Sequence, residues 1–62
     1  MDVQNVEIQI QTSQGHWQTV RSAPYVNNQY VNRQLEIAKS QHPKASVRAI
    51  DSETGALVNL LP

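Results

Sequence analysis

The chain of 62 residues contains no cysteine, so neither a disulfide nor a thiolate zinc site can stabilise it. Its two glycines are too few for a glycine-rich loop that cradles phosphate. A chain this short buries only about 60% of the surface that its unfolded form exposes, so its core is small. Self-association is therefore one way for it to bury more surface.

An excess of charge is also lacking. Five basic and five acidic residues balance, and neither sign forms a run, so no bulk attraction to nucleic acid or anionic lipid is expected. No apolar run approaches the roughly 20 residues of a membrane span, and the N-terminus lacks the pattern of a signal peptide. We expect a soluble protein of the cytoplasm that makes no contact with membranes.

Residues that carry chemistry are few and scattered. His16 and His42 are the only imidazoles, Asp51 and Glu53 are the only close pair of acids, and no metal-ligand spacing joins them. No serine lies in a Gly-x-Ser-x-Gly turn. We therefore predict no catalytic residue, metal or cofactor, and expect that the chain is not an enzyme. No stretch resembles a particular protein family.

Residues 27–42 are the only stretch with clear helical periodicity. Their apolar positions recur on one side of a helix, at Val31, Leu35 and Ala38. Asn27 or Asn28 can accept a hydrogen bond from an unpaired amide of the first turn, and Pro43 cannot continue the helix. The spacing predicts a helix over residues 27–42 whose apolar side covers a sheet.

Strand patterns flank this helix on both sides. Polar and apolar residues alternate in VEIQIQ, residues 6–11, which is typical of a strand with one face on a core. Four strands are predicted, at about residues 3–12, 17–22, 46–51 and 56–60.

These elements predict a single α+β domain, residues 1–62, in the order β-β-α-β-β. One helix packs on one face of a four-stranded, mainly antiparallel sheet. Strand order 2-1-3-4 is favoured because it makes every neighbour antiparallel, although other orders fit the same pattern.

The turn between the first two strands decides where Trp17 points. With a two-residue loop, Trp17 shares the aliphatic face of the sheet. With a three-residue loop in which Gly15 is left-handed, Val20 faces inward and Trp17 joins Gln9 and Gln11 on the other face. Both side chains can point inward only if a β-bulge lies between them.

The second hairpin surrounds a four-residue loop at residues 52–55. The resulting register places Ile50 opposite Leu57 on the face away from the helix, where Leu61 also falls. On the helix side the expected pairs are Ala49 with Val58 and Val47 with Leu60.

The face of the sheet away from the helix thus gathers apolar side chains within a polar rim, a combination that usually marks a contact surface. The candidate residues are Trp17, Ile50, Leu57, Leu61, Gln9 and Gln11. We hypothesise a small non-catalytic interaction domain that uses this face to bind a protein, most economically a second copy of itself. The alternative is an ordinary small sheet in which bulges turn some of these side chains inward.

A weak nucleic-acid-binding module is a second hypothesis. Arg21 and Arg48 would contact phosphates, and exposed aromatic residues such as Trp17 would stack on bases. The neutral charge balance and the absence of a known reader motif argue against it.

Overall fold

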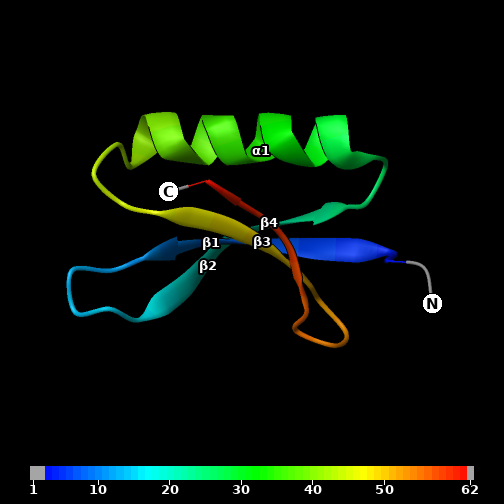
Figure 1. Cartoon of the computed structure of the whole chain (residues 1–62), viewed down its shortest axis with the longest axis horizontal. Helices are drawn as coiled ribbons and strands as arrows, with labels where there is room; N and C mark the ends of the chain where they lie inside the picture. Colours follow the sequence, from blue (N-terminus) through cyan, green and yellow to red (C-terminus); the bar gives the residue numbers. More distant parts are fainter. Residues whose placement is uncertain (1–2, 62) are drawn as a thin grey trace.

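Four strands and one helix make up the computed structural model, which describes residues 3–61 (Figure 1). In chain order they are β1 (Asn5–Gln11), β2 (Trp17–Pro24), α1 (Asn28–Gln41), β3 (Val47–Asp51) and β4 (Leu57–Leu61). The strands form a sheet in the order β2-β1-β3-β4, and every neighbouring pair is antiparallel. This confirms the predicted β-β-α-β-β layout and the 2-1-3-4 strand order.

Helix α1 is capped by residues that its sequence suggested. The side chain of Asn27 caps the first turn, because its Oδ1 accepts a hydrogen bond of 2.8 Å from the backbone N–H of Tyr30. At the other end the N–H of His42 donates to the carbonyl of Ala38, directly before Pro43. The helix is therefore one residue shorter at each end than predicted.

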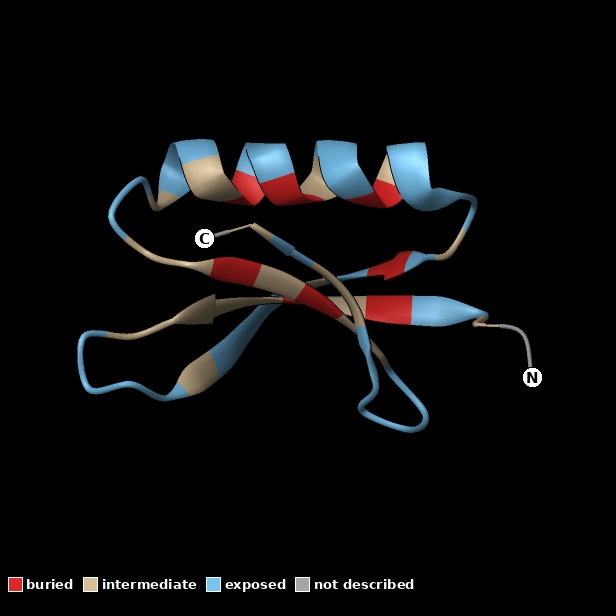
Figure 2. Cartoon of the chain, viewed as in Figure 1, coloured by how far each residue is buried: buried red, intermediate tan, exposed pale blue. Residues whose placement is uncertain are grey.

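The core lies between α1 and one face of the sheet (Figure 2). Its buried side chains are Val6, Ile8, Ala23, Val31, Leu35, Ala38, Val47 and Ala49. Strand β4 adds only the partly buried Val58 and Leu61. The core is thus small and consists of aliphatic residues, and the face of the sheet opposite α1 contributes nothing to it.

The first hairpin has a three-residue loop. Gly15 has a φ of +87°, and its N–H donates to the carbonyl of Thr12. The N–H of Thr12 donates to the carbonyl of His16. This loop places Trp17 opposite Gln11, on the face of the sheet away from α1. Of the two interpretations of the turn, the second is therefore right about Trp17.

A β-bulge at Val20 changes the rest of this pairing. Thr19 lies opposite Gln9 and Arg21 lies opposite Ile8, so Val20 is the extra residue. The prediction that Val20 faces inward beside this loop is wrong, since the bulge leaves it 41% exposed. Arg21 takes the place on the helix side instead.

A second bulge, at Val58, corrects the predicted register of β4. Ile50 lies opposite Leu57 as expected, but beyond the bulge Arg48 lies opposite Leu60 and Val47 lies opposite Leu61. The predicted sides of Leu60 and Leu61 are therefore exchanged. Leu61 packs against the core, and Leu60 is 46% exposed on the other face.

The residue between the bulge and Leu60 contacts the helix. Asn59 lies opposite the buried Ala49, on the helix side, and its amide Nδ2 donates a hydrogen bond to Oδ1 of Asn32 in α1. A contact between β4 and the helix thus accompanies the bulge.

Within residues 3–61, helix α1 is too short and too polar to cross a membrane.

Candidate interaction face

The side chains that point away from α1 form a surface that we call the open face. It lies on the side of the sheet opposite the helix in Figure 1. The strand pairings assign to it Glu7, Gln9, Gln11, Trp17, Thr19, Ser22, Arg48, Ile50, Leu57 and Leu60. In the part of the chain that the structure describes, no other element covers this face.

The open face is ordered in rows that cross the strands. The central row, from β2 to β4, consists of Thr19, Gln9, Arg48 and Leu60. The row on one side consists of Ser22, Glu7, Ile50 and Leu57, and Trp17 and Gln11 lie on the other side. Side chains that are directly opposite or diagonal in such rows lie close enough to interact.

Three hydrogen bonds link polar side chains across this surface. The Thr19 hydroxyl donates to Oε1 of Glu7 over 2.9 Å and accepts a bond of 3.0 Å from Nε2 of Gln9. Oε1 of Gln9 then accepts a bond of 2.8 Å from Nε of Arg48. The chain of bonds joins β2, β1 and β3, and it fixes which atoms of Gln9 point toward each neighbour.

Arg48 also stacks on Trp17. Its Cζ lies 4.1 Å from the centroid of the indole ring, and both side chains are half-buried. A guanidinium at this distance is attracted by the negative face of the ring. The stack and the bond to Gln9 hold the Arg48 side chain on the open face before any partner arrives.

Part of the hydrogen-bonding capacity of Arg48 is still unused. A guanidinium has five N–H donors, and Gln9 takes the one on Nε. Within residues 3–61, the donors on its two Nη atoms have no side-chain acceptor. The centre of the open face therefore offers a positioned cation with free donors.

The β3–β4 side of the open face is apolar. Leu57 is 59% exposed and Leu60 is 46% exposed, and Ile50 lies beside them, half-buried. These side chains adjoin the polar row at Arg48, which is opposite Leu60. The face thus combines exposed aliphatic surface with an ordered group of polar and aromatic side chains.

The structure brings together most of the candidate residues from the sequence. Trp17, Gln9, Gln11, Ile50 and Leu57 all lie on the open face. Leu61 does not, because the bulge in β4 turns it toward the core.

Sequence reasoning missed Leu60, Thr19 and Glu7 as members of this face, and it placed Arg48 only in the nucleic-acid hypothesis. The positions of Glu7 and Arg48 could have been read from strand alternation, because each lies between two buried aliphatic residues. Leu60 lies beyond a bulge that no local pattern signals, and Thr19 lies opposite Gln9 because the first hairpin has a three-residue loop.

The two arginines of the nucleic-acid hypothesis lie on opposite faces of the sheet. Arg21 is on the helix side, where its Nη1 donates a hydrogen bond of 2.8 Å to Oε1 of Gln34 in α1. The two tyrosines, Tyr25 and Tyr30, which could also have stacked on bases, pack against the core. Only Arg48 and Trp17 share a surface, so these residues do not form a joint basic and aromatic site.

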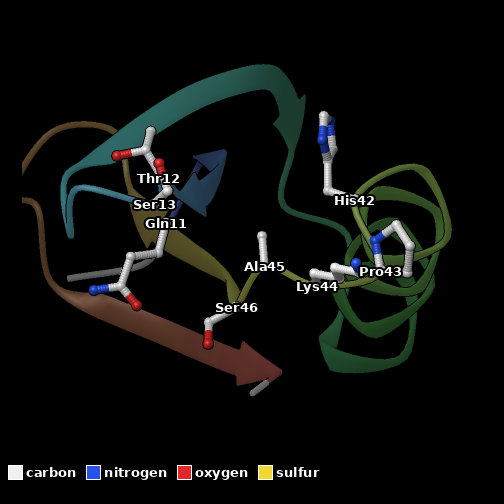
Figure 3. A pocket seen from close by; sticks show the side chains of 8 residues that line it. All are labelled: Gln11, Thr12, Ser13, His42, Pro43, Lys44, Ala45 and Ser46. Carbon is white, nitrogen blue, oxygen red and sulfur yellow. The ribbon is translucent and has the colours of Figure 1, made fainter.

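A hollow of about 470 Å³ lies at one end of the molecule, between the β1–β2 turn and the connection from α1 to β3 (Figure 3). It is lined by Gln11, Thr12, Ser13, His42, Pro43, Lys44, Ala45 and Ser46. This lining contains one imidazole and no carboxylate, so it presents no acid–base pair. Residues 3–61 contain no cluster of three or more side chains suited to hold a metal.

Comparisons of the chain with protein-family models, curated proteins and solved structures find no match. The interpretation of the open face therefore rests on its own geometry.

Proposed function

We propose that this chain is a small, non-catalytic protein-interaction domain whose open face binds a second copy of the chain. The observation that supports this most directly is the pairing of exposed Leu57 and Leu60 with the ordered Arg48–Trp17 stack on one surface. We also propose that the domain works in the cytoplasm, as its composition led us to expect.

The chemistry of the face suits a protein partner. Covering Leu57 and Leu60 removes apolar surface from water, which favours association by about 25 cal/mol for each Å². Tryptophan and arginine are enriched among the residues that contribute most to protein interfaces. Because Arg48 is already held by Gln9 and Trp17, its ordering on binding loses less conformational entropy.

Two features favour a second copy over an unrelated protein. The open face carries both a cation, Arg48, and an anion, Glu7, so two identical faces are complementary in charge. The chain is also neutral, so two copies do not repel each other. A typical interface takes about 800 Å² from each partner, which is roughly a fifth of the 4211 Å² that this chain exposes.

Sedimentation equilibrium over a concentration series tests the proposal. We expect the wild-type chain to reach a dimer by the high micromolar range, and Leu60→Glu to remain monomeric because a carboxylate would replace apolar surface within the contact. Val26→Glu is the matched control. Val26 is 61% exposed in the β2–α1 connection, so the same change there should leave the dimer intact.

Two results would overturn the proposal of self-association through this face. One is a wild-type chain that stays monomeric at high micromolar concentration. The other is a dimer that Leu60→Glu weakens no more than Val26→Glu does, since association would then use a different surface.

Nucleic acid is the alternative partner, and the geometry supports it less. Only the Arg48–Trp17 stack could contact a phosphate and a base together, because Arg21 is held by Gln34 on the other side of the sheet. A titration with single- and double-stranded oligonucleotides at low salt separates the two functions. Binding that weakens steeply with added salt and is lost in Arg48→Ala would favour nucleic acid.

A further inference from the structure

We propose that two copies meet face to face about a two-fold axis, and that Arg48 of each copy forms an ion pair with Glu7 of the other. This inference rests on the proposed self-association and adds its register.

Glu7 and Arg48 are diagonal neighbours on adjacent strands. Glu7 lies opposite Ile50, and Arg48 lies opposite Gln9, two residues along each strand. Diagonal positions of this kind are about 7–8 Å apart. Within one copy each charge has a different polar partner, since Thr19 donates to Glu7 and Arg48 donates to Gln9.

A two-fold axis converts this offset into two equal contacts. In a symmetric dimer, if one residue meets a second residue of the other copy, the reverse contact also forms. An axis that lies between the sheets, perpendicular to the line from Glu7 to Arg48 and midway along it, brings each residue over the opposite charge of the other copy. In this register the dimer contains two equivalent ion pairs, each between Glu7 of one copy and Arg48 of the other.

The atoms that are still available fit this contact. Thr19 uses Oε1 of Glu7, which leaves Oε2 for a donor from the second copy. The two Nη atoms of Arg48 can donate side by side to a carboxylate, a strong arrangement. The hydrogen bonds to Thr19 and Gln9 hold both charges in place, so the pair needs little rearrangement to form.

The apolar neighbours of Glu7 and Arg48 favour this register over others. Ile50 lies opposite Glu7 and Leu60 lies opposite Arg48, so closing the interface removes water from around both charges. A charge that lost its partner there would be desolvated without compensation. Any register that misaligns the two faces is disfavoured for that reason.

Charge-reversal variants test the register. Arg48→Glu places two acidic residues in each contact of a symmetric dimer, and Glu7→Arg places two basic residues there. We expect each variant alone to dimerise at least about tenfold more weakly than the wild type. Mixed in equal amounts, the two variants should form a heterodimer, because every contact then joins Glu with Arg again.

A second pair of variants controls for net charge. Arg33→Glu and Glu36→Arg change the chain by the same charges at exposed positions on α1, away from the open face. If the register is right, each control variant dimerises like the wild type, and their mixture shows no preference for the heterodimer. Analytical ultracentrifugation with one copy labelled with a fluorophore measures all of these equilibria.

The outcomes separate this inference from the proposed function. A wild-type dimer that Leu60→Glu disrupts, but that Arg48→Glu and Glu7→Arg leave unchanged, would overturn the register and keep the face. A monomeric wild type would remove both. Formation of the heterodimer also shows that both variants fold, so loss of their homodimers cannot be assigned to unfolding.

Discussion

At the scale of single residues, the second hairpin depends on the left-handed backbone of Gly55. Its φ is +77°, and an added Cβ would meet no atom within 4 Å, so a substitution there strains only the backbone. Gly55→Ala should lower the free energy of unfolding by about 1 kcal/mol, as measured by urea denaturation. Gly55→Asn should lose less, because asparagine adopts this conformation more readily. Equal losses for both variants would contradict backbone strain as the cause.

The side chain of Asn27, which caps α1, is a second single residue on which the stability of the fold depends. Asn27 satisfies the N–H of Tyr30, so Asn27→Ala should lower the free energy of unfolding by about 1 kcal/mol. Asn27→Ser should keep most of the stability, since a hydroxyl can accept the same bond. Gln29→Ala, at an exposed position of the first turn, is the control and should have little effect. Urea denaturation of the three variants measures the difference, and the cap is refuted if Asn27→Ala matches Gln29→Ala.

At the scale of elements, α1 holds the sheet through a single buried stripe centred on Leu35. Leu35→Ala should cost about 2–5 kcal/mol, against a total of roughly 3–9 kcal/mol for a domain of this length. We therefore expect the variant to lose a large share of its stability, and to unfold at a much lower urea concentration than the wild type when followed by circular dichroism. Ile37→Ala, on the exposed side of the same helix, should remain folded. A cooperatively folded Leu35→Ala with less than about 1 kcal/mol lost would mean that the core lies elsewhere.

The same elements show what a local pattern can predict. Helix α1 and strand β1 follow from periodicity, caps and alternation, which all lie within short stretches of sequence. The strand order is favoured because it makes every neighbour antiparallel, although other orders fit the same local patterns. The register of β4 does not follow from a local pattern, because its apolar residues, Leu57, Val58, Leu60 and Leu61, do not alternate with polar ones. The bulge at Val58 coincides with a contact between Asn59 and Asn32, which are 27 residues apart.

The candidate site likewise contains residues whose places a local pattern predicts and residues whose places it does not. Alternation alone predicts that Gln9, Gln11 and Ile50 leave the core. The place of Trp17 depends on the length of a turn that Gly15 can close in two ways. The bond from Arg48 to Gln9 spans 39 residues and requires the pairing of β1 with β3. Such contacts cannot be predicted before the sheet is assembled.

At the scale of the whole molecule, a small core should make stability depend on association. If the folded dimer unfolds to separate chains, its melting temperature, Tm, rises with protein concentration because dilution favours the unfolded state. For two chains of this length we expect a rise of up to about 6 °C for each tenfold increase in concentration. Differential scanning calorimetry over a hundredfold range measures this shift.

The matched glutamate variants decide what causes that shift. Leu60→Glu should have a Tm that does not depend on concentration, whereas Val26→Glu should follow the wild type, since only Leu60 lies on the open face. If the Tm of the wild type stays constant over the whole range, the folded chain is equally stable alone. No dimer would then be present at the melting temperature, a result that would count against self-association through the open face.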